Sequence, residues 1–168
     1  HNSSSAASDV YKRQVYDLPF EISPSYNTEA EHDTLVYIKN DSSNLYVAFK
    51  AFGNRDFIRA GIRARDGINW LDDQVAIGID TFGDGRYYIR FSANPLGSIG
   101  DNKVDNKDDF DGSYNVEFDA KARLTDLGYE VEFVIPFSSL NFPDTNNQKW
   151  ALMLSRKLYN KGTESRYM

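Results

Sequence analysis

The sequence predicts an all-β protein, an antiparallel β-sandwich of two sheets in a jelly-roll or immunoglobulin-like arrangement. Segment after segment alternates apolar and polar residues with a period of two, the pattern of half-buried strands. Short runs of turn residues separate these segments, and there is almost no helical period. At 168 residues the chain has the length of one domain. Two sheets are expected because one sheet would cover only one face of the apolar stripes.

The first strands are predicted to form a hairpin. Residues 34–39 and 44–52 each alternate, and the polar residues 40–43 between them supply the turn. The apolar side of each strand is expected to face the core.

Residues 74–80 and 87–92 carry the clearest hairpin pattern in the chain. Apolar residues occupy every second position in both segments. Between them, Gly83, Asp84 and Gly85 tolerate the positive φ angles that a tight reversal of the chain requires. This hairpin is therefore predicted with its turn at residues 80–85.

The C-terminal part continues in the same way. Residues 137–140 are expected to form one short turn of helix, and Trp150 is expected in the core. Residues 125–128 are read as a turn. The remaining alternating segments are 114–124, 129–135 and 150–158.

Composition excludes several classes of protein. The net charge of −6 and the pI near 4.9 argue against a nucleic-acid partner, which would require clustered Lys and Arg. The absence of cysteine excludes a disulfide framework and a thiolate metal site. No apolar run approaches the roughly 20 residues that a membrane-spanning helix needs, so this segment is not expected to insert into a membrane.

The domain boundaries follow from the two ends of the sequence. Residues 1–14 mix Ser, Ala, Lys and Arg without the apolar middle of a secretory signal, and are predicted to be a disordered or non-native leader. Residues 15–168 are assigned to the β-sandwich. A strand-like run reaches the last residue, so the domain is expected to be truncated at its C-terminus.

The acidic tract at residues 101–112, DNKVDNKDDFDG, is predicted to be a loop. Clustered Asp and Asn oxygens beside Gly suit a calcium ion. The tract fails as an EF-hand, because placing Gly112 at the sixth position puts Lys107 at the first and Phe118 at the last. A solvated acidic excursion between strands is the favoured interpretation.

A polar surface with small neighbours is predicted on the central hairpin. With direct pairing, Tyr88 and Arg90 share a face with Gln74, Ala76 and Ser92, which outlines a groove. The guanidinium is a rigid fork of donors that can bridge neighbouring sugar hydroxyls. The alternative is a solvent-facing Arg and Tyr that stabilise each other across the sheet.

Glu130 and Glu132 are the best candidates for acid-base chemistry. Two positions apart on a strand, they would lie about 6.6 Å apart, at the lower edge of the roughly 6.5–9.5 Å spacing of inverting glycosidases. Both would point the same way, so pairing with Arg123, Lys121 or Arg156 is the favoured interpretation. His1 and His32 are the only histidines, which argues against a Ser-His-Asp triad or a His-based metal site.

Two blocks of residues carry a resemblance over residues 19–166. The first block comprises Asp72-Asp73, Ile79-Asp80-Thr81, Asn94-Pro95-Leu96-Gly97 and Asp101. The second comprises Gly128-Tyr129-Glu130-Val131-Glu132, Ile135-Pro136-Phe137, Leu140, Phe142-Pro143, Trp150 and Ser155-Arg156. In order and spacing, these blocks resemble the family 9 carbohydrate-binding modules (CBM9), in the variant found at the N-terminus of bacterial DUF5916-type envelope proteins.

The resemblance implies a non-catalytic carbohydrate-binding module of a larger extracytoplasmic protein that acts in polysaccharide binding or catabolism. It implies a glycan ligand, a downstream barrel-like region of the same polypeptide as partner, and a location in the periplasm or at the outer membrane. It also implies a structural calcium ion, without assigning its ligands. The alternative is a structural or interaction domain that packs against an outer-membrane barrel region and binds no sugar.

The resemblance also assigns candidate site residues. Trp70 stands where the modules carry a tryptophan that stacks on a sugar ring, although a lone loop Trp often packs over the end of a sandwich instead. The sequence departs from the modules at Ala76, where they carry a sugar-contacting glutamate, so their binding mode does not transfer intact and the non-binding alternative gains weight. The polar contacts to sugar are expected from Tyr88, Arg90, Asn94 and Arg156.

Overall fold

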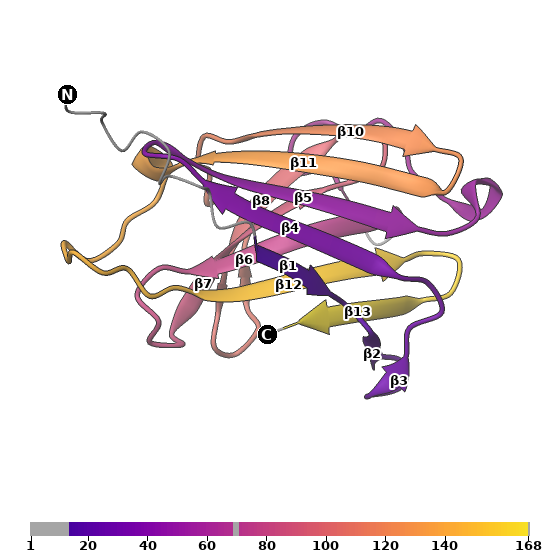
Figure 1. Cartoon of the computed structure of the whole chain (residues 1–168), viewed down its shortest axis with the longest axis horizontal. Coiled ribbons are helices and arrows are strands. Elements are labelled where there is room, and N and C mark those ends of the chain that lie inside the picture. The colour runs from indigo at the N-terminus through magenta and orange to yellow at the C-terminus, as the bar shows by residue number, and fades with distance from the viewer. Residues whose placement is uncertain (1–13, 69–70, 168) are drawn as a thin grey trace, which may run out of the picture.

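The computed structural model describes residues 14–68 and 71–167, which form two antiparallel sheets packed face to face, so the predicted β-sandwich is confirmed (Figure 1). The five-stranded sheet has the order β1 (Gln14–Asp17), β4 (Thr34–Asn40), β5 (Asn44–Phe52), β11 (Gly128–Pro136), β10 (Asp119–Thr125). The eight-stranded sheet has the order β3 (Thr28–Glu29), β2 (Phe20–Ser23), β13 (Thr163–Tyr167), β12 (Ala151–Leu158), β6 (Gln74–Asp80), β7 (Tyr87–Ala93), β8 (Ile99–Asp105), β9 (Phe110–Asp111).

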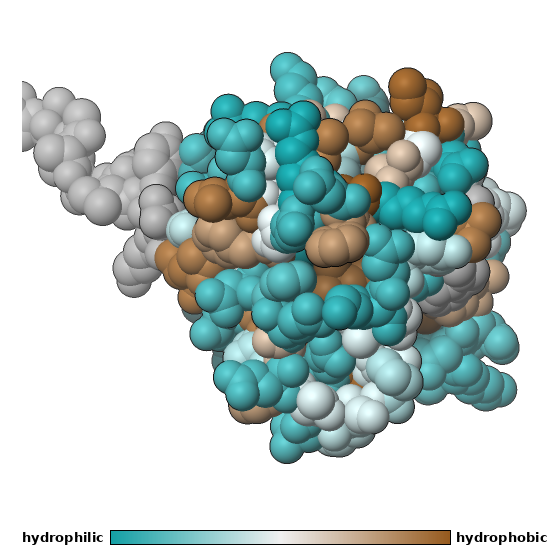
Figure 2. Space-filling view, turned by 90° about the vertical axis from the view of Figure 1, so that its right-hand side faces the viewer, coloured by the Kyte–Doolittle hydropathy of each residue, from teal (hydrophilic) through white to brown (hydrophobic). Residues whose placement is uncertain are grey.

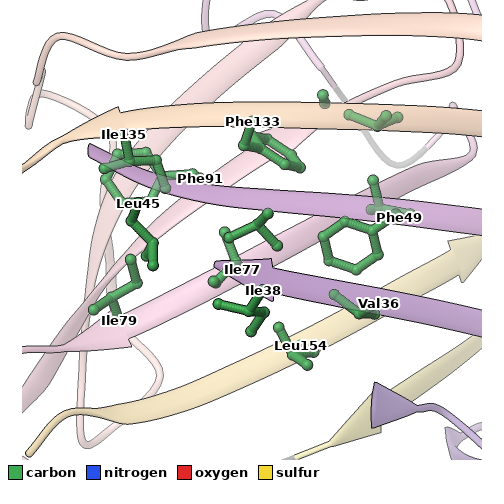
Figure 3. Packing of buried hydrophobic residues seen from close by; sticks show 14 of the residues in the cluster. Val36, Ile38, Leu45, Phe49, Ile77, Ile79, Phe91, Phe133, Ile135 and Leu154 are labelled. Carbon is green, nitrogen blue, oxygen red and sulfur yellow. The ribbon is translucent and has the colours of Figure 1, made fainter. Parts of the chain in front are cut away.

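The apolar core fills the space between the two sheets (Figure 3). Alternate residues of β4 and β5 are buried, as the period-two pattern predicts. Phe49 and Phe133 from neighbouring strands meet edge to face with ring centroids 5.9 Å apart. From the other sheet, Phe91 contacts Phe118, with ring centroids 4.9 Å apart. The two predicted hairpins therefore lie on opposite sides of one core.

β6 is buried on both of its faces, although its alternation predicts a half-buried strand. Val75, Ile77 and Ile79 face the core. Ala76 and Gly78 face outward and are still covered, because β6 lies in the middle of the larger sheet with β12 and β7 on either side. The outward face of this sheet is therefore lined by close neighbours and is not simply open to water.

The turn between β6 and β7 is the predicted one. The Asp80 carboxylate accepts hydrogen bonds from the backbone N–H groups of Phe82, Gly83 and Gly85 at 2.8 to 3.0 Å. Gly83 and Gly85 adopt φ of 65° and 69°, a region that L-residues with a Cβ avoid. One carboxylate and two glycines thus fix the reversal.

The predicted loop at residues 101–112 is wrong in its first part. Asp101 to Asp105 belong to β8, which pairs with β7 along its length. Asp101 is tolerated inside a strand because its carboxylate accepts hydrogen bonds from the Arg65 guanidinium at 2.5 Å and from the Val116 N–H at 2.8 Å. The charged side chains hid this strand from the pattern, because the partners of Asp101 lie far from it in sequence.

Two further expectations need correction. Residues 114–118 form no strand, because this segment carries the chain from one sheet to the other before β10 begins. Its alternation reflects packing, as Phe118 is buried against Phe91. Trp150 precedes β12 and is only half-buried, in contact with the rings of Phe137 and Phe142.

The described helical segments are two short 3₁₀ turns, η1 (Arg55–Phe57) and η2 (Phe137–Ser139), and the second is the predicted helical turn. No helix in residues 14–68 and 71–167 is long and apolar enough to cross a membrane. β1 starts at Gln14, the last residue of the predicted leader, while residues 1–13 and 168 lie outside the described residues.

Candidate functional site

The outer face of the eight-stranded sheet is hollowed into a cavity of about 360 Å³. Its strand residues alternate with core residues, as Arg90 does with Phe91, so they point away from the sandwich interior. We call this cavity the outer groove. Its lining consists of Ile68, Gln74, Tyr88, Arg90, Asn102, Phe110, Met153, Ser155, Lys157, Glu164 and Arg166.

The sheet beneath the groove carries small side chains. Ser155 is paired with Ala76, and Ala76 with Ser92, across three adjacent strands. Ser92 is in turn paired with Gly100. Ser155 lines the groove, whereas Ala76 and Ser92 are almost completely buried and Asp66 lies over Gly100, so most of this row is already covered by neighbouring side chains.

Arg90 stands on β7 at the side of this floor. Its Nη2 donates a hydrogen bond to Gln74 Oε1 at 2.9 Å. A guanidinium has five N–H donors, so others are available to a ligand. Burial lowers the pKa of the Arg90 guanidinium, whose charged form has lost part of its hydration. An arginine in this condition is prepared to bind an acceptor.

Tyr88 packs flat on the sheet next to Arg90. A Cβ placed on Gly78 would come within 2.6 Å of Tyr88 Cδ2 and 3.1 Å of Met153 Cε. Glycine at position 78 therefore lets the phenol ring lie against β6. Burial raises the pKa of Tyr88, so its hydroxyl remains protonated at neutral pH and can donate a hydrogen bond.

β12 and β13 complete the groove with three charged side chains. Arg166 Nη2 donates to Glu164 Oε1 at 3.0 Å. Lys157 is paired in register with Glu164 across the strands. Burial lowers the pKa of the Lys157 ammonium, and the nearby positive charge of Arg90 adds to this effect. The two sides of the groove are thus close enough to interact electrostatically.

Sequence reasoning found Tyr88 and Arg90 but missed Asn102, Lys157, Glu164 and Arg166. Alternation within 150–158 places Lys157 on the same side as Ser155, which was a usable signal. The position of β13 beside β12, and of β8 beside β7, is a matter of sheet order. Nothing in a single strand's pattern reveals which strand lies next to it.

Trp70, the predicted stacking residue, lies outside the described residues. The described residues closest to it in sequence that line the outer groove are Ile68 before it and Gln74 after it. Its role therefore stays a prediction.

Asn94 is placed away from the groove and is fully buried. Its Oδ1 accepts hydrogen bonds from the N–H groups of Leu96 and Ser98, both at 3.0 Å. Its Nδ2 donates to the Gly61 carbonyl at 2.7 Å. Asn94 was expected to contact sugar, but in the structure its side chain makes the hydrogen bonds that hold the turn after β7.

Arg156 points to the opposite face of β12 from Ser155, into the end of the sandwich. It is 2% exposed and reaches the other sheet, where it donates to the Asp33 and Phe52 carbonyls and to Thr34 Oγ1. It also lines a cavity of about 420 Å³ at this end, together with Asp73 and His32. We call it the end pocket. Arg156 therefore does not join Arg90 in one site.

Figure 2 looks onto the right-hand end of the molecule as drawn in Figure 1, where β5 and β12 end. The surface there is largely hydrophilic, and hydrophobic side chains appear as separate patches.

Burial raises the pKa of Asp73 in the end pocket. Two contacts oppose this rise: the N–H of Tyr159 donates a hydrogen bond to the Asp73 carboxylate at 2.7 Å, and Arg156 carries a positive charge nearby.

The glutamate pair proposed for acid-base chemistry lies on the other sheet. Glu130 accepts a hydrogen bond from Arg123 Nε at 2.7 Å, and Lys50 Nζ lies 3.7 Å from it. The pairing of Glu130 with Arg123 was one of those expected, whereas Arg156, another expected partner, lies in the end pocket. Glu132 is exposed on the same strand. The pair is not part of the outer groove.

The acidic tract uses its carboxylates locally. Asp105 Oδ1 accepts from the N–H groups of Lys107 and Asp109, and Asp111 Oδ1 accepts from the N–H of Ser113. Within the described ranges, no group of three or more His, Cys, Asp or Glu residues is arranged to hold a metal ion. A structural calcium ion stays a prediction, without a ligand set.

No protein-family model matches the sequence, and no curated protein matches it either. Among solved structures, the chain is similar to a protein of Bacteroides uniformis ATCC 8492 to which carbohydrate binding has been ascribed. The two are 14% identical with a TM-score of 0.72, over 92% of this chain and 76% of that one.

The chain is also similar to a carbohydrate binding module family 9 (CBM9) from Caldicellulosiruptor kristjanssonii. The structure with cellotriose gives a TM-score of 0.58 at 14% identity, over 83% of this chain and 67% of that one. The structure with glucose gives 0.60 at 12% identity, over 91% and 73%. This chain has the CBM9-like fold. The expectation of that fold from the two sequence blocks is confirmed.

Proposed function

We propose that this chain is a non-catalytic carbohydrate-binding module of a larger extracytoplasmic protein and that the outer groove is its ligand site. The observation that carries the proposal is the groove itself: a half-buried arginine and a tyrosine line a cavity of about 360 Å³ together with the polar side chains of Gln74, Asn102 and Ser155. The fold supports it, since the two CBM9 structures that share it hold cellotriose and glucose.

The lining suits the two kinds of surface that a sugar presents. Hydroxyl groups need donors and acceptors in fixed positions, and Arg90 and Gln74 offer both from adjacent strands. Ring C–H faces need apolar contact, and Tyr88, Phe110 and Met153 in the lining offer it.

Trp70 is proposed as a stacking platform at this groove. Support comes from Ile68 and Gln74, which lie on either side of it in the sequence and both line the groove. An indole presents a large π-face together with an N–H donor, which suits a pyranose ring.

Tryptophan fluorescence offers a direct test, because Trp70 and Trp150 are the only tryptophans. In a Trp150→Phe variant every change in tryptophan emission reports on Trp70. Titration with xylo-, cello- and manno-oligosaccharides is expected to give a saturable change with at least one of them. Calorimetry on Trp70→Ala is then expected to show at least tenfold weaker binding.

A matched pair of variants ties the binding to the groove. Arg90→Gln is expected to weaken binding at least tenfold, while Arg123→Gln on the exposed face of the other sheet is expected to leave it unchanged. A flat response to all glycans would contradict the proposal and favour a domain that packs against a barrel-like partner region. Equal losses in both variants would remove the groove as the site.

A further inference from the structure

The outer groove differs in charge from the protein around it. Its described lining contains the basic residues Arg90, Lys157 and Arg166 and a single acidic residue, Glu164. The chain as a whole carries a net charge of −6. A positive groove in an acidic chain is a local arrangement and does not follow from the overall composition.

These cations are partly removed from water. The pKa values of Arg90 and Lys157 are both lowered, with burial as the largest cause. Glu164 is the nearby carboxylate that opposes this lowering in both cases. Since Glu164 also accepts the hydrogen bond from Arg166, it interacts with all three cations of the groove, and Asp73 outside the lining also acts on Lys157. The charge balance of the groove is left incomplete.

Two buried polar atoms in the groove point to the same conclusion. Arg166 Nε and Asn102 Oδ1 have no hydrogen-bond partner among the described residues. Both residues line the groove. Buried donors and acceptors are nearly always satisfied in folded proteins, and a ligand or a water molecule can supply the partners that these two atoms lack. The first atom requires an acceptor and the second a donor.

The sheet on the other side of the molecule provides a contrast. There, Glu130 is flanked by Arg123 and Lys50, and Glu132 adds a second carboxylate. The cavity there is lined by three basic side chains, Lys50, Lys121 and Arg123, against these two carboxylates, and the charges are interspersed as on an ordinary solvated surface. The excess of cations is therefore larger in the outer groove, where three basic residues face one acidic residue.

We infer that the outer groove selects a negatively charged sugar residue, one that carries a carboxylate or a sulfate beside its hydroxyl groups. The inference rests on the proposed function and adds the class of ligand. The anionic group would accept hydrogen bonds from Arg166 Nε and from guanidinium N–H groups of Arg90 other than the one that donates to Gln74. A sugar hydroxyl would donate to Asn102 Oδ1.

Matched pairs of ligands test the charge and distinguish its sources. Calorimetry would compare trigalacturonate with its methyl ester, and a sulfated carrageenan tetrasaccharide with its desulfated form. In at least one pair, the charged form is expected to bind at least tenfold more tightly than the neutral form. Lys157→Gln is expected to lower the ratio of the two affinities, charged over neutral, at least threefold. Lys121→Gln on the five-stranded sheet is expected to leave this ratio unchanged.

Salt provides a second readout. Raising the ionic strength from ~0.01 to ~1 M shortens the Debye length from ~30 to ~3 Å. This change is expected to lower the affinity for the charged ligand more than the affinity for its neutral form. Binding of a neutral form as tight as that of its charged form, in both pairs, would overturn the inference and leave the proposed function standing. Failure of charged and neutral ligands alike, including the xylo-, cello- and manno-oligosaccharides, would overturn both.

Discussion

Arg90 and Arg156 extend from the same sheet, yet they leave it on opposite faces and meet different surroundings. Arg156 enters the end pocket and donates to two backbone carbonyls and one hydroxyl of the other sheet. Arg90 enters the outer groove, where its described side-chain hydrogen bond goes to Gln74. One guanidinium joins the two sheets, and the other lines the groove that we propose as the ligand site.

This difference teaches how to separate structural from functional arginines. Burial alone does not decide, because Arg156 is buried and Arg90 is half-buried. What decides is the partner: main-chain carbonyls hold Arg156 to the framework, whereas Arg90 contacts the amide side chain of Gln74. The following changes test that distinction, in order of their expected effect on the free energy of unfolding.

Arg156→Leu is expected to have the largest effect. It removes three hydrogen bonds and the positive charge that opposes the rise in the pKa of the buried Asp73 carboxylate, so the free energy of unfolding should fall by about 3 to 5 kcal/mol in urea titrations. Arg123→Leu, at a side chain that is 73% exposed, should change it by no more than about 1 kcal/mol. Similar small effects in both variants would remove the distinction.

The loss in Arg156→Leu is expected to depend on pH. Burial already raises the pKa of Asp73, and without the opposing charge of Arg156 this pKa should rise further. A group whose pKa is raised on folding contributes stability at low pH and loses it as pH rises through its folded pKa. The variant should therefore lose more stability at pH 7 than at pH 4, and the difference should vanish in the Arg156→Leu, Asp73→Asn double variant.

Asn94→Ala tests the second residue that the structure places away from the groove. Loss of its three hydrogen bonds inside a buried turn should lower the free energy of unfolding by about 1 to 3 kcal/mol. Glycan affinity at a temperature where the variant is folded should stay the same. A tenfold loss of affinity with unchanged stability would return Asn94 to the ligand site.

Gly78→Ala probes the contact that places Tyr88. The added Cβ would collide with the phenol ring and with Met153, which should lower the free energy of unfolding by about 1 to 3 kcal/mol through overpacking. Because the ring must move, glycan affinity should fall as well. Unchanged affinity in the folded variant would show that Tyr88 has no part in binding.

Arg90→Gln should change stability least. One hydrogen bond to a neutral amide is lost, so the free energy of unfolding should fall by no more than about 1 kcal/mol in urea titrations. The main effect of Arg90→Gln is expected on glycan affinity and not on stability. A loss of stability as large as that of Arg156→Leu would show that Arg90 is also part of the framework.

Much of the fold could be predicted from local pattern. The hairpins of β4 with β5 and β6 with β7 alternate clearly and have polar or Gly-rich turns. β8 was missed because its Asp and Lys residues resemble a loop, and only tertiary partners such as Arg65 make a strand possible there. Local pattern describes strands whose partners are near in sequence.

The candidate site could be predicted only in part. The alternation of residues 87–92 predicted that Arg90 points away from the core. The alternation of residues 150–158 places Arg156 on the same side as the buried Leu154, so the sequence could have separated the two arginines. Arg166 and Asn102 belong to the groove because β13 and β8 lie where they do in the sheet. That order is set by long-range pairing, which periodicity does not contain.

Ala76 lies midway along the row of small residues, with Ser92 on one side and Ser155 on the other. Ala76 is fully buried and is not part of the groove lining, so a bulkier side chain there would have to displace the side chains that cover it. A series of increasingly large residues at position 76 would therefore measure how much free volume the outward face of this sheet retains.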